Sequence, residues 1–128
     1  CRSRQGSYSL TMADRDPRAY LNDVLESCDR VLSNLEKTTL ENFRNDLNMQ
    51  DVFTRRFEII GEAVKRIPSS VRDRYPDVAW RDAAGFRDVI AHDYVDIEID
   101  QLYSTAVNDL PVLRKQIAAI IADIDKHI

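Results

Sequence analysis

Apolar residues recur at spacings of three and four along most of this chain, which is the period of one face of an α-helix. The first stripe lies in residues 17–37, and Asp16 followed by Pro17 supplies a helix start signal before it. The pattern predicts a long amphipathic helix. Its buried face comprises Leu21, Val24, Leu25, Cys28, Val31, Leu32 and Leu35.

A shorter pattern over residues 40–47 leads into a second long stripe, which ends at Ile67. This helix should stop before Pro68, because the residue that precedes a proline is pushed out of helical geometry. Residues 69–75 are predicted to add one short turn. The positions of the long stripe are Phe53, Phe57, Ile60, Val64 and Ile67.

Two more helices are predicted after Pro76. Residues 78–93 form the first of them, with a narrow buried stripe that includes Trp80. From Ile99 to Ile124 the four-three spacing continues through Pro111, which predicts one long helix kinked at that proline.

No segment alternates with period two between turn signals, so strands are not expected. The predicted fold is all-α, an up-and-down bundle of about four to five helices. Gly61 and Gly85 both fall inside predicted helices, where glycine costs about 1 kcal/mol relative to alanine. Close approach of neighbouring helices is the expected compensation.

The chain has 128 residues, of which 44% are hydrophobic and 31% charged. These values fit one globular domain, expected over residues 17–128, and no apolar run approaches the ~20 residues of a membrane span. Residues 1–16 are expected to be a flexible N-terminal segment or an expression-vector remnant. The two cysteines, Cys1 and Cys28, suit neither a disulfide framework nor a metal site, which favours a reducing cytoplasm.

The net charge of −4 conceals a basic middle. Residues 55–87 hold eight arginines and lysines against five acidic residues, a local excess of three positive charges. Such a segment could follow a phosphate backbone, or it could be a set of ordinary solvated helix faces. The basic residues are Arg55, Arg56, Lys65, Arg66, Arg72, Arg74, Arg81 and Arg87.

The candidate chemistry is concentrated in residues 87–94, which contain Arg87, Asp88, His92 and Tyr94. A guanidinium can hold a phosphate through paired donors, and an imidazole can move a proton near neutral pH. Together they suit cleavage of a phosphodiester without a metal. A plain structural role is the alternative, in which these side chains cap carbonyls, pair with Asp88 or Asp93, and pack a ring.

Context makes the motif more specific than its spacing alone. Trp80 and Gly85 precede it on the same segment, and Ile60-Gly61-Glu62-Ala63 lies on the helix before. With Tyr75-Pro76, Arg87-x4-His92-x-Tyr94 and Asp109-Leu110-Pro111, the chain resembles the HEPN superfamily, and within it the HepT-like ribonuclease toxins. The resemblance covers most of residues 17–126. Asp88 stands where the family often has Asn.

The resemblance implies a homodimer in which two motifs face each other across a cleft and cut RNA by attack of the ribose 2′-hydroxyl on the adjacent phosphate. His92 would be the general base or acid, and Arg87 would hold the scissile phosphate. Positions 87 and 92 lie ~140° apart on a regular helix, which fits a site built from two chains better than one. No cofactor or metal is expected.

The family likeness also implies regulation at Tyr94. A small nucleotidyltransferase antitoxin is expected to transfer AMP to this phenol, so that the added phosphate occupies Arg87 and obstructs RNA. Tyr94 and Arg87 are seven residues apart and would share a face if the helix persisted. The competing interpretation is a non-catalytic helical adaptor that binds a nucleotidyltransferase.

Five acidic residues have roles that are open or minor. Asp88 either orients the imidazole of His92 or forms a weak surface ion pair. Glu62 is either a solvated charge or a support for the cleft. Asp96, Glu98 and Asp100 are expected to complement the dipole at a helix start and not to bind a metal.

Overall fold

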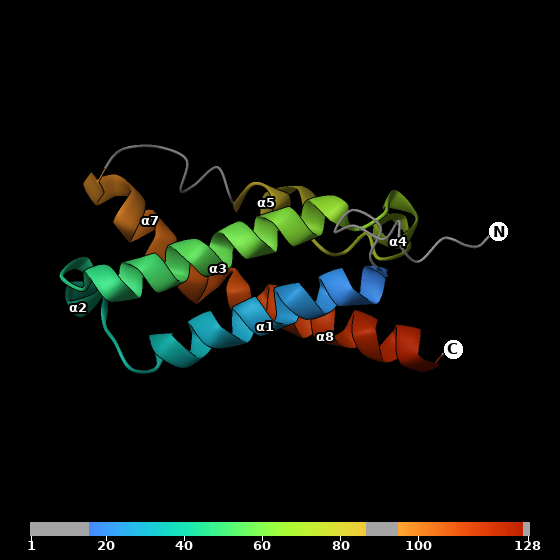
Figure 1. The fold of residues 1–128 in the computed structure, drawn as a ribbon, viewed down its shortest axis with the longest axis horizontal. Helices are drawn as coiled ribbons and strands as arrows, with labels where there is room; N and C mark the ends of the chain where they lie inside the picture. The colour runs from blue at the N-terminus through green and yellow to red at the C-terminus, as the bar shows by residue number, and fades with distance from the viewer. Residues whose placement is uncertain (1–15, 87–94, 127–128) are drawn as a thin grey trace, which may run out of the picture.

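Helices are the only regular elements in the part of the chain that the structure describes, residues 16–86 and 95–126 without the side chains of 95–98. Among these residues of the computed structural model, four helices are long and three are short (Figure 1). The predicted all-α helical fold is confirmed. The long helices are α1 (Pro17–Leu35), α3 (Leu47–Arg66), α7 (Val95–Asn108) and α8 (Leu110–Lys126); the short ones are α2 (Leu40–Arg44), α4 (Ser69–Arg74) and α5 (Trp80–Ala84).

Local start and stop signals act where the sequence predicts them. The Asp16 carboxylate accepts a hydrogen bond from the backbone N–H of Arg18 at 2.9 Å, and Pro17 begins α1. At the other boundary, α3 ends at Arg66 and Ile67 is extended, with φ −70° and ψ 126°, directly before Pro68. These two helix limits are therefore determined by residues adjacent to them.

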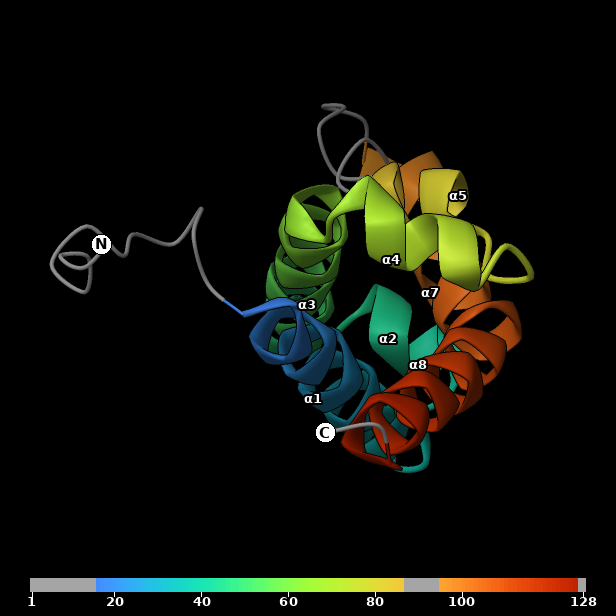
Figure 2. The ribbon, with the colours of Figure 1, turned by 90° about the vertical axis from the view of Figure 1, so that its right-hand side faces the viewer.

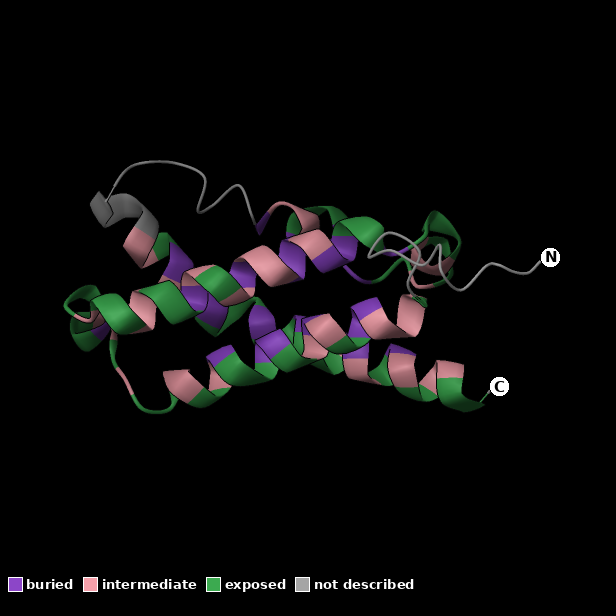
Figure 3. Ribbon diagram, in the orientation of Figure 1, coloured by how far each residue is buried: buried purple, intermediate pink, exposed green. Residues whose placement is uncertain are grey.

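The core lies where the apolar faces of α1, α3 and α8 meet, and buried positions turn toward the middle of the bundle (Figure 3). Leu21 of α1, Phe57 of α3 and Ile117 of α8 are completely buried. Cys28 is also buried, and burial raises the pKa of its thiol to about 12. The predicted stripes thus form one continuous hydrophobic core.

The helix predicted over residues 78–93 is corrected in the described part. It begins at Trp80, because the Trp80 N–H donates to the Val78 carbonyl in the turn after Pro76 at 2.8 Å. It ends at Ala84, and Gly85 is its C-cap, with φ −80° and ψ −2°. Gly85 therefore closes α5 and does not lie inside a helix. Phe86 is helical again, and residues 87–93 of the predicted helix lie outside the described residues.

The long helix predicted through Pro111 is divided at the single residue Asp109, so two helices, α7 and α8, take the place of one kinked helix. The Asp109 N–H still donates to the Thr105 carbonyl at 2.8 Å, and the Leu113 N–H donates to the Asp109 carbonyl at 3.0 Å. Pro111 is the second residue of α8, where its missing N–H removes no intrahelical bond. The two helix axes run in clearly different directions (Figure 1).

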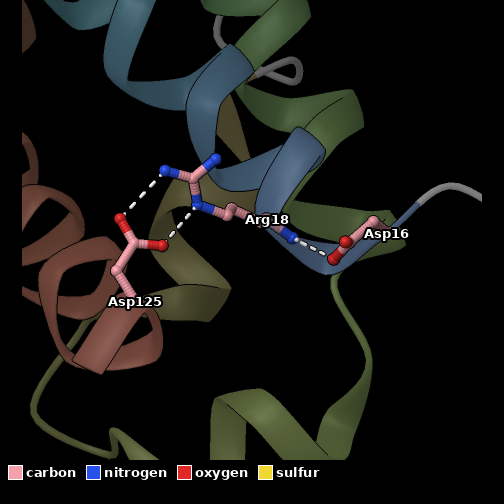
Figure 4. Close-up of polar contacts among 3 residues, drawn as sticks. All are labelled: Asp16, Arg18 and Asp125. Atoms are coloured by element: carbon pink, nitrogen blue, oxygen red, sulfur yellow. Dashed lines mark hydrogen bonds and ion pairs between the residues drawn. The ribbon is translucent and has the colours of Figure 1, made fainter. Parts of the chain in front are cut away.

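Ion pairs join helix segments that are far apart in sequence. The Arg18 guanidinium, near the start of α1, donates two hydrogen bonds to the Asp125 carboxylate of α8, at 2.8 and 2.9 Å (Figure 4). Arg114 of α8 donates to Asp29 of α1 at 2.5 Å. The α1–α8 contact is therefore bracketed by two charged pairs. Across the described ranges, no helix combines the length and apolarity that a membrane crossing requires.

Candidate functional site

The predicted catalytic and modified residues Arg87, Asp88, His92 and Tyr94 lie outside the described residues. The structure instead describes the two segments that enter and leave this motif. Phe86 is the last described residue before it, and Val95 begins α7 after it. The surroundings of the motif follow from how these two segments are held.

The entering segment is anchored by aromatic packing. Phe86 is 6% exposed, and its ring stacks on Phe57 of α3 with centroids 5.2 Å apart and an interplanar angle of 29°. Trp80, at the start of α5, donates its indole N–H to the Tyr75 carbonyl at 2.9 Å. Residues 75–86 therefore reach Arg87 from a segment fixed at both of its ends.

Tyr75 connects this segment to α8. Its hydroxyl donates to the Asp123 carboxylate of α8 at 2.5 Å. That hydrogen bond, followed by partial burial and the charge of Asp123, raises the pKa of the Tyr75 phenol. The Tyr75-Pro76 step, part of the family resemblance, thus serves to position α5.

Glu62 lies half-buried on α3, directly after the buried Gly61. Helix α5 packs against α3, on the side of α3 away from α1 (Figures 1 and 2). Glu62 is therefore on the helix that carries the entering segment of the motif. Its predicted role as a support for the cleft stays a prediction.

The leaving segment is held by a bidentate ion pair. Arg44 of α2 donates to both carboxylate oxygens of Asp100 in α7, at 2.8 and 2.7 Å. This hydrogen bonding lowers the pKa of Asp100. Asp100 therefore has a structural partner, whereas the side chains of Asp96 and Glu98 lie outside the described part. Among the side chains that the structure describes, no three His, Cys, Asp or Glu residues are grouped so as to hold a metal ion.

A small pocket of about 190 Å³ brings the Asp109-Leu110-Pro111 step next to the entering segment. Its lining includes Phe86 and Ala83 from one side and Asp109 and Val112 from the other. Two segments that are more than twenty residues apart in sequence thus meet at Phe86, the last described residue before the motif. Spacing along the chain did not predict this neighbourhood.

The basic middle of the sequence does not form one continuous track in the described part. Arg55 and Arg56 line a groove of about 930 Å³ between α1 and α3, together with acidic residues such as Glu26 and Asp51. Arg72 and Arg81 line a separate groove of about 600 Å³ between α4 and α5. The local excess of positive charge is therefore divided between two faces.

Comparison with known protein families also covers residues 87–94, which the structure does not describe. Residues 24–120 match the family described as Ribonuclease HepT-like. The chain belongs to the HepT-like ribonuclease family. This membership confirms the predicted family and, with it, the predicted enzyme class, and the matched range includes residues 87–94 as well as Asp109-Leu110-Pro111.

Individual relatives are similar over nearly their whole length. "Putative RNase MJ1216" of Methanocaldococcus jannaschii is 34% identical over 89% of this chain and 94% of the relative. "Putative RNase TTE0752" of Caldanaerobacter subterraneus is 33% identical over 84% of this chain and 96% of the relative. "Probable ribonuclease HepT" of Thermococcus cleftensis is 32% identical over 78% and 91%. No solved structure matches the chain.

Proposed function

We propose that this protein is a metal-independent endoribonuclease that acts as the toxin of a toxin–antitoxin pair in the cytoplasm. The family match carries the proposal, because it extends across the whole Arg87–Tyr94 motif and both segments that flank it. The relatives named as RNases are similar over nearly their full length, which supports RNA as the substrate.

In the proposed reaction, the ribose 2′-hydroxyl attacks the adjacent phosphorus. A new O2′–P bond forms, the P–O5′ bond breaks, and the 5′-oxygen leaves with a proton. His92 moves a proton as general base or acid, and Arg87 holds the phosphate and stabilises the charge that develops on it. Because this nucleophile belongs to the RNA, the reaction needs no activated water and no metal.

The proposed active unit is a homodimer. On a regular helix the side chains of Arg87 and His92 would point ~140° apart, so one copy would direct only one of them at a given phosphate. A second copy across a cleft supplies the other. Asp88 is proposed to orient His92, and Glu62 to support the cleft from α3.

The partner proposed for this dimer is a small nucleotidyltransferase antitoxin that transfers AMP to Tyr94. The phenol oxygen attacks the α-phosphorus of ATP, and pyrophosphate leaves. The attached phosphate carries negative charge and hydrogen-bond acceptors, and these would compete with RNA for Arg87. Modification would then silence cleavage without unfolding the chain.

Cleavage of total RNA in the presence of a chelator tests the enzymatic proposal, once intact mass shows that Tyr94 is unmodified. We expect the wild type to cut and both His92→Ala and Arg87→Ala to lose activity by about a hundredfold or more. Equal cleavage by wild type and His92→Ala, or none by either, would contradict the proposal; no cleavage would favour the non-catalytic adaptor.

Incubation with the partner enzyme and ATP tests regulation. We expect the wild type to gain the mass of one AMP per chain and Tyr94→Phe to gain none. Cleavage should fall in proportion to the modified fraction of the wild type. A modified protein that still cuts RNA at the full rate would refute the proposed switch.

A further inference from the structure

We propose that the groove between α4 and α5 is a phosphate-binding subsite for the RNA strand, with Arg72 and Arg81 as its cations. This inference rests on the proposed function, since it takes RNA as the substrate. The groove measures about 600 Å³. Its lining includes Ser69, Arg72, Pro76, Trp80, Arg81 and Ala84.

Arg72 lines this groove and carries one donor without a partner among the described residues. Its side chain is half-buried, and its Nε atom is buried without a hydrogen-bond partner within the described part of the chain. Leaving a charged donor buried and unpaired is unfavourable, whereas a phosphate offers several acceptor oxygens in a geometry that matches a guanidinium. No described acceptor therefore holds the Arg72 guanidinium, and the part of the side chain that lines the groove can take a phosphate as its partner.

The contrast with other arginines supports this assignment. Arg18, Arg44 and Arg114 each donate to an aspartate and thereby join two helices. Within the same described ranges, Arg72 and Arg81 form no such ion pair. Their charges remain available to a ligand that enters the groove.

One acidic residue shares the groove. Asp73 also lines it, but it forms no ion pair with Arg72 or Arg81. The formal charge of the lining is therefore two positive against one negative. A phosphodiester carries a single negative charge, so the net attraction is suited to one phosphate.

The walls of the groove are held in place by the segment described above. Trp80 is 8% exposed and donates to the Tyr75 carbonyl, so it forms a fixed wall and not a mobile side chain. Pro76 restricts the backbone between α4 and α5. A site prepared in this way loses little conformational entropy when it binds a phosphate.

The groove also lies close to the proposed catalytic motif along the chain. Ala84 belongs to its lining and precedes Arg87 by three residues, which limits the separation of their Cα atoms to about 11 Å. A strand whose scissile phosphate reaches Arg87 could therefore place a neighbouring phosphate in the groove. The subsite would orient the strand without taking part in the chemistry.

The groove between α1 and α3 is a weaker candidate for the same ligand. Its basic residues are interspersed with acids, and Arg30 already donates to Glu26 at 3.1 Å. Asp29, on the same face, pairs with Arg114. A polyanion would meet both signs of charge there.

Binding of a fluorescent oligonucleotide tests the subsite directly. The probe is a 2′-O-methylated single strand, which lacks the free hydroxyl needed for cleavage, and its anisotropy is followed over a series of NaCl concentrations. For Arg72→Gln/Arg81→Gln we expect about tenfold weaker binding. The slope of log K against log salt should fall by about 0.7 for each arginine removed.

Arg74→Gln is the matched control, because it removes one positive charge from the same helix at an exposed position outside the groove. We expect it to leave the affinity nearly unchanged. Arg72→Lys should keep the wild-type salt slope but lose part of the affinity, since a lysine keeps the charge and loses the paired donors. Circular dichroism should show that all variants are folded.

The outcomes separate the subsite from the proposed function. If the wild type cuts RNA and the double variant binds the probe with unchanged affinity and salt slope, the subsite is overturned and the function stands. If the wild type binds the probe through Arg72 and Arg81 but cuts no RNA, the subsite stands and the enzymatic proposal fails. A wild type that does not bind the probe overturns the subsite.

Discussion

The α1–α3–α8 bundle and the corner formed by α4 and α5 are built in different ways. In the bundle, long helices bury continuous apolar faces, and the ion pairs Arg18–Asp125 and Arg114–Asp29 lie across the α1–α8 contact. The corner consists of two helices of six and five residues, and α4 buries no residue fully. Its attachment depends on a few specific contacts from Tyr75, Trp80 and Phe86.

This difference separates stability from function. The bundle supplies most of the buried apolar area, so truncation there should unfold the protein. The corner leads directly into Arg87 and lines the proposed phosphate subsite. Changes in the corner should therefore affect RNA cleavage more than they affect the free energy of unfolding.

The largest expected effect is the difference in Cys28 reactivity between the native and the denatured protein, because Cys28 lies deep in the bundle. A pKa of about 12 leaves very little of the reactive thiolate at neutral pH. In a Cys1→Ser background, we expect Cys28 to react with a thiol reagent on the order of a thousandfold more slowly in the native than in the denatured protein. Equal rates in the two states would mean that α1 does not hold this face closed.

Phe57→Ala should be the most destabilising substitution of those considered, because Phe57 is fully buried on α3 and also supports Phe86. The expected loss is about 3–5 kcal/mol in the free energy of unfolding, measured with urea. Val52→Ala on the same helix is the control, since Val52 is 38% exposed, and its effect should stay within about 0.5 kcal/mol. Similar losses in both variants would contradict the assigned core.

Phe86→Leu tests the corner. Leucine keeps much of the apolar volume but removes the ring stacking on Phe57, which should cost about 1 kcal/mol of stability. RNA cleavage should fall by about tenfold, because the segment that enters the motif loses its anchor. A folded variant with full activity would show that Arg87 does not depend on this contact.

The smallest effect is expected for the exposed pair of Arg44 and Asp100. Because the folded pKa of Asp100 is lowered, the pair stabilises the protein above the ordinary Asp pKa of about 3.9. That contribution disappears as the pH falls through the lowered pKa. The difference in Tm between wild type and Asp100→Asn should therefore be small at pH 7 and vanish at low pH.

Asp77→Asn is the control for removal of a carboxylate charge, since the Asp77 side chain forms no ion pair among the described residues. It should change the Tm at pH 7 less than Asp100→Asn does. High salt should also reduce the effect of Asp100→Asn at pH 7, because the pair is solvent-exposed. A difference that is equal at pH 7 and at low pH would exclude the ion pair as its source.

The periodic sequence predicted the bundle well. The stripe with Cys28 became the buried face of α1, and the stripe with Phe57 became that of α3. Asp16 and Pro68 marked helix limits correctly, because capping and the restriction before proline act over one or two residues. Two predicted helices, over residues 78–93 and 99–124, were too long. They are interrupted at Gly85 and Asp109, where turns break an apolar spacing that continues on both sides.

The sequence proposed Arg87, His92 and Tyr94 as site residues through the family resemblance, and their roles stay a prediction. By itself the sequence also determined the helical class and the buried faces, since a period of three to four is a local property. Only the tertiary structure paired Arg18 with Asp125, brought Asp109 beside Phe86, and divided the basic residues between two faces. These relations depend on how the helices pack, and packing joins residues that no local pattern connects.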